Sequence, residues 1–165
     1  MKRVLISKAI KEETIFMIDN NSKEFSQPYY NSINGRIKFL DFKKIKLSED
    51  KLEETYPNEL LQNPIACLRL EYVNLNHNEN TIEIFENNCN LVDLDEYSFK
   101  VFSTKGYGHG MEKEIYEIFN LPVESFYGEN DFIPKIKQTI ELFFVVPDED
   151  TDYYFEIING KIEEL

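Results

Sequence analysis

The chain has 165 residues, of which 42% are hydrophobic and 30% charged, a balance typical of one globular domain and not of a disordered chain. Its formal net charge of -13 disfavours nucleic acids and anionic membranes as partners and favours a basic protein or a cation. No apolar run approaches the roughly 18 residues of a membrane span, so we expect no membrane-spanning segment.

The N-terminal residues 1–35 are predicted to form an extension made of a β-hairpin and a linker. Two β-rich runs, Val4 to Ile10 and Thr14 to Ile18, would be the hairpin strands. The apolar run after the first three residues is too short for an export signal, which needs roughly 7 to 15 apolar residues. We therefore expect a cytoplasmic location if Met1 is the native start, and otherwise an extracellular or cell-envelope location.

Residues 36–165 are predicted to form the main domain, entered through a turn at Asn34-Gly35. The segment Arg36 to Leu47 alternates between apolar and basic side chains, which predicts a half-buried strand. The alternation changes phase between Leu40 and Lys44, which indicates a bulge. A small basic stripe here consists of Lys38, Lys43, Lys44 and Lys46. We expect this stripe to be a solvated strand face and not a phosphate-binding surface.

The rest of the chain alternates short apolar runs with turns rich in Asn and Asp. A short helical turn is expected at Ser48 to Glu54 and a second helix at Met111 to Phe119. The final Asn159-Gly160 is expected to turn the chain into an edge segment. The predicted strands are Ala66 to Val73, Thr81 to Phe85, Cys89 to Val92, Tyr97 to Phe102, Thr139 to Val146 and Tyr153 to Ile158.

These elements, together with 13 Phe and 10 Tyr, predict a mainly β fold. Many short strands separated by turn signals are typical of an immunoglobulin-like antiparallel β-sandwich. We expect about seven to nine strands and one or two short helices.

Three segments carry a resemblance to a known family. They are an apolar strand ending in an Asn-rich turn at Cys67 to Asn76, a hairpin with two aspartates before a tyrosine at Asn90 to Tyr97, and a strand closed by proline at Glu141 to Pro147. Together with the strands between them, they resemble the telokin-like, immunoglobulin-type domains of small lipoproteins and secreted proteins of low-GC bacteria. The resemblance implies an extracellular or cell-envelope domain with no shared catalytic residues.

The side chains able to carry nucleophilic or metal chemistry are few. Cys67 and Cys89 lack metal-site spacing; two buried free thiols are expected, and a single bridge between strands stays open. His77 and His109 are the only histidines, so a catalytic triad or dyad would have to use one of them. His77 is expected to be a solvated turn residue, and a hydrolase using His109 is the weakest hypothesis. We therefore predict a protein that is not an enzyme and has no cofactor.

Acidic turns are the strongest candidates for a site. Residues 51–165 hold 24 acidic and eight basic residues, a net charge of -16, whereas residues 1–50 carry +3. We predict a protein-binding module, an acidic inhibitor or immunity-type protein, that engages a basic partner. A calcium-binding sandwich is a further alternative, although the turns lack the glycine and closing glutamate of an EF-hand loop. The predicted partner-binding residues are Asp93, Asp95, Glu96, Asp148, Glu149, Asp150, Asp152, Tyr153 and Tyr154.

Overall fold

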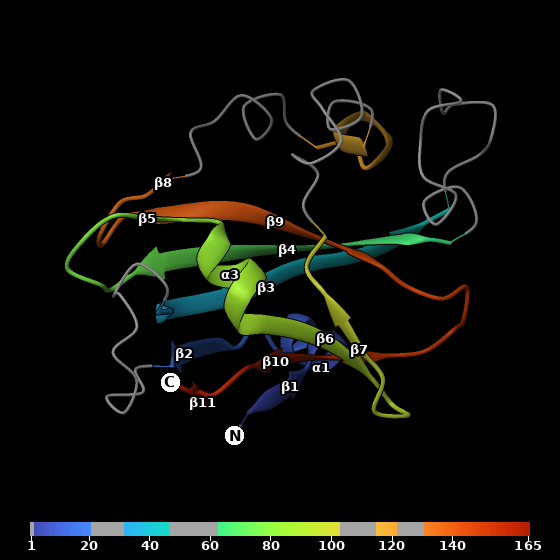
Figure 1. Cartoon of the computed structure of the whole chain (residues 1–165), viewed down its shortest axis with the longest axis horizontal. Helices are drawn as coiled ribbons and strands as arrows, with labels where there is room; N and C mark the ends of the chain where they lie inside the picture. The colour runs from blue at the N-terminus through green and yellow to red at the C-terminus, as the bar shows by residue number, and fades with distance from the viewer. Residues whose placement is uncertain (1, 21–31, 47–62, 103–114, 122–130) are drawn as a thin grey trace.

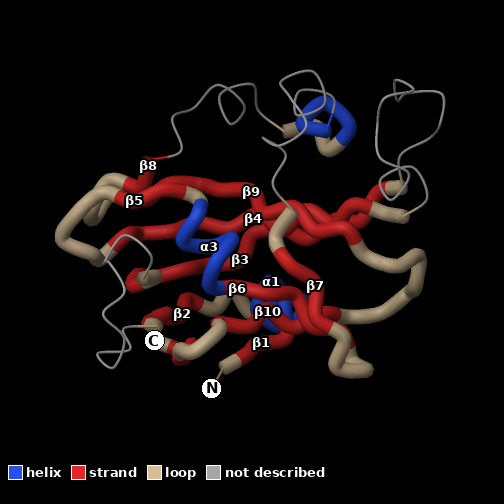
Figure 2. Tube along the Cα trace, viewed as in Figure 1, coloured by secondary structure: helices blue, strands red, loops and turns tan. Residues whose placement is uncertain are grey.

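The computed structural model describes residues 2–20, 32–46, 63–102, 115–121 and 131–165. Two antiparallel sheets form the two layers of a β-sandwich (Figure 1), and strands make up most of the described chain (Figure 2). The predicted fold class, a mainly β sandwich with short helices, is confirmed. In the described part of the chain, no helix has the length and apolar character needed to cross a membrane.

The first layer is a four-stranded sheet in which every pair of neighbours is antiparallel. Side chains alternate across it, so Tyr153, Phe155 and Ile157 are buried while the residues between them are half-buried. This sheet contains the three strands predicted to begin at Cys89, Tyr97 and Tyr153. In spatial order the strands are β1 (Arg3–Leu5), β10 (Tyr153–Ile157), β6 (Cys89–Asp93) and β7 (Ser98–Lys100).

The second layer is a five-stranded antiparallel sheet, with strands in the spatial order β11 (Lys161–Glu164), β2 (Ile15–Asp19), β3 (Asn34–Ile45), β4 (Ile65–Asn74) and β9 (Lys137–Val145). The register between β3 and β4 shifts between Phe39 and Asp41, which leaves Leu40 as the extra residue. The bulge predicted from the change of phase is confirmed. The terminal edge strand expected after Asn159 is also confirmed, as β11, and Asn159 takes a positive φ of 53°.

The predicted N-terminal hairpin is wrong. Residues Ile6–Lys11 form a helix, α1, and the strands on either side of it enter different layers: β1 pairs with β10, and β2 lies between β11 and β3. A helix places Ile6, Ala9 and Ile10 on one face, and that face packs into the core between the sheets. The described part of residues 1–35 thus contributes to both layers.

The turn expected at Asn34-Gly35 is also wrong, because both residues begin β3, opposite Asp19 and Ile18. The boundary expected at residue 35 therefore falls inside a strand. Glycine is needed here for close approach, since a Cβ atom would collide with the carbonyl oxygen of Val73 and the ring of Tyr72.

The strand expected at Thr81 to Phe85 is replaced by two elements. A short strand, β5 (Asn80–Thr81), pairs with β8 (Asp131–Phe132), and a helix, α3, follows at Glu83–Asn88. A strand would turn Ile84 and Phe85 to opposite faces, but both are fully buried in the same cluster. The helix achieves this because consecutive residues can share its buried side, where the side chain of Asn88 donates to the carbonyl oxygen of Ile84 at 2.6 Å.

Other predicted elements lie wholly or partly outside the described residues. These are the helical turn at Ser48 to Glu54, the His109 loop, and the first part of the helix predicted at Met111 to Phe119. The described part of that helix, residues 115–118, is helical as predicted.

The hydrophobic core has two parts separated by the five-stranded sheet. Between the layers, Ala66, Leu68, Leu70 and Tyr72 of β4 pack against the inner face of the other sheet. The alternate residues of β4 face outward, where a second cluster joins the sheet to the segment 115–121. The buried residues of this outer cluster are Ile65, Cys67, Ile115, Phe119 and Phe143.

Candidate functional site

The strand register brings the two predicted acidic turns to one end of the sandwich. Tyr153, the first residue of β10, pairs with Asp93, the last residue of β6. The turn that leaves β6 and the segment that enters β10 therefore start side by side, on the right of Figure 1. We name this region the acidic end; its carboxylates belong to Asp95, Glu96, Asp148, Glu149, Asp150 and Asp152, all exposed.

Asp93 builds the first of these turns and does not face solvent. Its carboxylate accepts the backbone N–H groups of Asp95 and Tyr97, both at 2.9 Å, and Asp93 is only 4% exposed. Its own N–H donates to the carbonyl oxygen of Tyr97 at 2.9 Å. An aspartate that accepts from backbone groups two and four residues onward fixes a tight turn. Asp93 therefore supports the surface expected to meet a partner and adds no side chain to it.

The same turn exposes two large side chains that the sequence analysis did not select. Leu94 is 55% exposed and Tyr97 is 68% exposed, directly beside the carboxylates of Asp95 and Glu96. Tyrosine is enriched in protein interfaces, and an exposed aliphatic residue beside it extends the apolar contact. The sequence could have indicated both residues, because Leu94 lies within the predicted acidic turn and Tyr97 directly follows it.

Some carboxylates of the acidic end already have intramolecular partners. Glu96 receives both of its contacts from one guanidinium nitrogen of Arg3, at 2.8 and 3.0 Å, while the other nitrogen bonds Glu156 at 2.8 Å. The hydrogen bond with Glu96 raises the pKa of Arg3, so this cation stays charged. Asp148 lies 3.6 Å from the ammonium of Lys46. Four carboxylates of the acidic end have no ion-pair partner within the described ranges: Asp95, Glu149, Asp150 and Asp152.

The two tyrosines expected at the surface differ from each other. Tyr153 is 3% exposed because its position in β10 points inward, where its ring lies 5.6 Å from that of Phe42 and 6.2 Å from that of Phe99. Its buried hydroxyl has no hydrogen-bond partner among the described residues, and burial raises the pKa of Tyr153. Tyr154 points the other way and is half-buried, with the guanidinium of Arg3 5.7 Å from its ring centre. Tyr153 is thus a core residue, which corrects the prediction.

The basic stripe expected along β3 does not form one face. The bulge at Leu40 changes the phase, so Lys43 pairs with Asp41 at 3.5 Å while Lys44 turns to the acidic end. There the ammonium of Lys44 donates to the carbonyl oxygen of Glu149 and lies 5.9 Å from the ring centre of Tyr153. These contacts tie the segment entering β10 to β3, and they explain why part of the basic stripe is not available to phosphate.

The two cysteines are free and buried, as predicted. Cys67 belongs to the outer cluster of the five-stranded sheet, whereas Cys89 lies in the core between the layers. Burial raises the pKa of Cys67 to about 12 and that of Cys89 well above its usual value. Because the thiolate is the reactive form, both thiols are poor nucleophiles and poor metal ligands at neutral pH.

The remaining candidates for metal or catalytic chemistry find little support in the described ranges. There, no three His, Cys, Asp or Glu side chains gather in a way that could hold a metal ion. His77 is exposed in the loop after β4, as expected for a solvated turn residue. His109 lies outside the described residues.

Comparison with models of protein families, with curated proteins and with solved structures finds no match to this chain. The resemblance to telokin-like domains therefore stays a prediction.

Proposed function

We propose that this protein is a non-enzymatic binding module that engages a basic protein through its acidic end, in the manner of an acidic inhibitor or immunity-type protein. The observation that supports the proposal is the pairing of Tyr153 with Asp93, which joins two distant acidic turns into one surface. Four carboxylates there have no ion-pair partner among the described residues, and Leu94 and Tyr97 are exposed beside them.

The arrangement suits recognition of a basic protein for two physical reasons. Carboxylates that remain hydrated create a negative potential that attracts a basic partner and speeds the encounter, mainly at low ionic strength. Leu94 and Tyr97 supply apolar area that is removed from water on contact, and tyrosine is among the residues that dominate the binding energy of many interfaces. Charge thus selects the partner and sets the association rate, while the two apolar side chains slow dissociation.

The carboxylates are not expected to contribute equally. Glu96 and Asp148 already contact Arg3 and Lys46, so a partner's cation would have to compete with these contacts. Asp95, Glu149, Asp150 and Asp152 face no such competition among the described residues. Mutations of this second group should therefore have the larger effect on association.

The proposal is tested by affinity capture from the lysate of the source cell with three baits, washed at low and high salt, followed by mass spectrometry. The baits are the native protein, an acidic-end variant and a control variant in which four exposed acidic residues elsewhere are reversed. Both variants change the net charge by the same amount. The acidic-end variant carries Asp95→Lys, Glu149→Lys, Asp150→Lys and Asp152→Lys; the control carries Glu79→Lys, Glu83→Lys, Asp131→Lys and Glu163→Lys.

We expect a basic protein in stoichiometric amount with the native and control baits, released by salt and lost with the acidic-end bait. Association rates measured with that purified protein should fall at least tenfold in the acidic-end variant at low salt, within the range that electrostatic steering spans. Equal rates for both variants would refute the proposal.

Absence of any specific partner would shift the weight to the alternative of an extracellular or cell-envelope immunoglobulin-like domain. A cytoplasmic partner would instead support the cytoplasmic location proposed for a native start at Met1. Calorimetric titration with Ca²⁺ separates both from the calcium-binding alternative, which requires saturable heat at a defined stoichiometry.

A further inference from the structure

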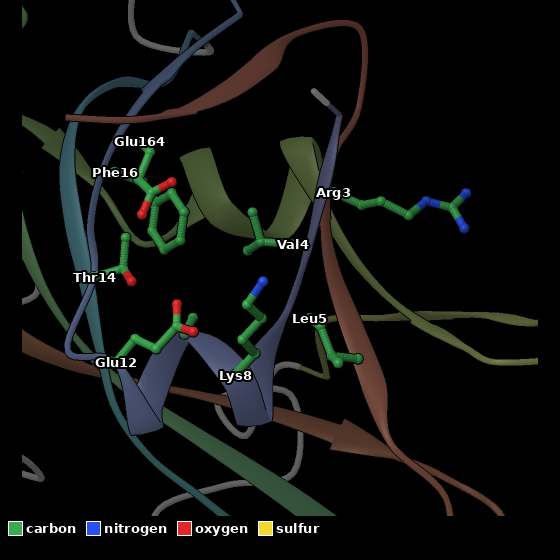
Figure 3. A pocket seen from close by; sticks show the side chains of 9 residues that line it. Arg3, Val4, Leu5, Lys8, Glu12, Thr14, Phe16 and Glu164 are labelled. Carbon is green, nitrogen blue, oxygen red and sulfur yellow. The ribbon is translucent and has the colours of Figure 1, made fainter.

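A pocket of about 280 Å³ lies where the N-terminal strand and helix meet the edge of the second layer. It is bordered by β1 and β11, each the edge strand of its sheet, and by α1 and β2 (Figure 3). None of the residues proposed to bind the protein partner lines it, although Arg3 at its border bonds Glu96 of the acidic end. The lining residues whose side chains the argument uses are Val4, Lys8, Ala9, Glu12, Thr14, Phe16 and Glu164.

The inner part of the pocket is apolar and fixed by the core. Val4, Ala9 and Phe16 line it, and all three are buried members of the cluster between the sheets. Phe16 is held by its neighbour Phe39, with ring centres 5.9 Å apart. This floor can therefore receive a small apolar group without rearrangement of the backbone.

The rim carries charges of both signs that do not neutralise one another. Figure 3 shows the ammonium of Lys8 and the carboxylates of Glu12 and Glu164 at the open space, while the side chains of Arg3 and Leu5 point away from it. None of the three has an ion-pair partner within the described parts of the chain. Arg3 is occupied by Glu96 and Glu156. The hydroxyl-bearing Thr14 completes the rim.

We propose that this pocket binds a free α-amino acid with an aliphatic side chain. The zwitterion offers a carboxylate to Lys8 and an ammonium to Glu12 and Glu164, and its side chain reaches the floor formed by Val4, Ala9 and Phe16. Such a ligand leaves none of the three rim charges without an opposite charge. Ionised groups that bind each other through hydrogen bonds form the stronger class of polar contacts.

Other small ligands match the pocket less completely. A simple carboxylate meets Lys8 but also faces two glutamates, and a simple amine meets the glutamates but leaves Lys8 unmatched. An uncharged apolar molecule uses only the floor. The volume is slightly below the usual lower bound of about 300 Å³ for drug-sized ligands, which favours a ligand the size of a single amino acid.

The test is a titration of the isotope-labelled native protein with L-leucine, followed by two-dimensional NMR. We expect saturable shifts confined to the amides of β1, α1, β2 and β11. Because the rim is exposed, the dissociation constant should be weak, on the order of 1 mM for a ligand of about nine non-hydrogen atoms. Two analogues separate the charges: 4-methylpentanoate lacks the ammonium, and 3-methylbutylamine lacks the carboxylate. Each should bind at least tenfold more weakly than L-leucine.

Variants assign the charges to residues. Lys8→Met and Glu164→Gln should each weaken L-leucine binding about fivefold to tenfold, and Lys8→Met should leave the affinity for 3-methylbutylamine unchanged or raised. Lys11→Met and Glu163→Gln are matched controls, since both lie on the same elements but outside the pocket. All four residues are exposed, so the variants should fold, which circular dichroism verifies.

Three results would overturn the proposal. These are the absence of shifts at tens of millimolar L-leucine, shifts that centre outside the four elements, or equal affinity for L-leucine and its two analogues. The first two come from the native protein alone and do not depend on any variant.

Discussion

The two ends of the sandwich use polar side chains in opposite ways. At the acidic end, carboxylates point into solvent and four of them have no ion-pair partner in the described ranges. At the opposite end, on the left of Figure 1, asparagines are buried or half-buried among backbone groups. We name this the asparagine end; its residues are Asn20, Asn74, Asn76, Asn80 and Asn88.

Hydrogen bonds from the asparagines join segments that are distant in sequence. The side chain of Asn74 donates to the carbonyl oxygens of Asn78 and Phe132, at 3.0 and 2.8 Å, and accepts the N–H of Asn76 at 2.9 Å. Asn20 donates to the side chain of Asn88 and accepts the N–H of Ile33 at 2.7 Å. These bonds close the asparagine end except at Asn80, whose buried side-chain oxygen has no hydrogen-bond partner among the described residues.

The difference follows from the cost of burial. An amide is neutral and can be buried if its donors and acceptors find partners, whereas an isolated carboxylate cannot be buried without a much larger penalty. Asparagine therefore serves structure at one end, and unpaired aspartate and glutamate remain at the surface of the other. The comparison predicts that mutations at the asparagine end change stability, while most mutations at the acidic end change binding alone.

The largest effect is expected from the aromatic group beneath the asparagines. Phe132 packs edge to face with Tyr72 and Phe85, with ring centres 5.1 and 5.8 Å apart. Phe132→Ala should lower the free energy of unfolding by about 3–5 kcal/mol, as typical for a buried phenylalanine. Equilibrium denaturation in urea measures the free energy of unfolding of the variant and of the native protein. Tyr97→Ala, at the acidic end, is the control and should change stability by less than about 0.5 kcal/mol. Similar losses in both variants would break the comparison.

Asn74→Ala should have the next largest effect, because it leaves two carbonyl oxygens and one N–H group without their partner. We expect a loss of about 1–3 kcal/mol in the free energy of unfolding, toward the upper part of that range. The measurement is the same urea titration. A loss no larger than that of Asp95→Asn would show that these bonds contribute nothing.

Asp93 is the exception within the acidic end and sharpens the comparison. Its carboxylate accepts two backbone N–H groups at 2.9 Å, so Asp93→Ala should destabilise by about 1.5–3 kcal/mol, the range for hydrogen bonds to a charged group. Asp95→Ala, two residues along, should be nearly neutral. Thermal unfolding of the two variants side by side is decisive, and equal melting temperatures would contradict the role given to Asp93.

The smallest effect is expected at alkaline pH and concerns the buried Tyr72 of the asparagine end. Burial raises the pKa of Tyr72, so the folded state holds this proton more tightly than the unfolded state, whose tyrosines titrate near about 10. The stabilisation is complete below that pH and declines above it by about 1.36 kcal/mol per pH unit. Tyr72→Phe should reduce the slope of stability against pH above this value. A slope identical to that of the native protein would contradict the burial of the Tyr72 hydroxyl.

Local sequence patterns correctly predicted the elements whose structure depends mainly on residues adjacent in the sequence. Alternation located most of the long strands, and its change of phase located the bulge at Leu40. The turn after β6 and the edge strand β11 followed from their Asp, Asn and Gly residues. The buried free thiols followed from cysteines within apolar strands. The helix α1 was missed because its six residues are too few to distinguish a helical period from a short β-rich run.

The sequence by itself determined that this is a mainly β protein with a strongly acidic C-terminal two-thirds, because periodicity and charge can be counted along the chain. The tertiary structure alone decided that Tyr153 lies beside Asp93, that Tyr153 is buried while Leu94 and Tyr97 are exposed, and that β1 and β11 border one pocket. The physical reason is that strand pairing joins residues distant in sequence, and a shift of one residue in register reverses the face of every side chain.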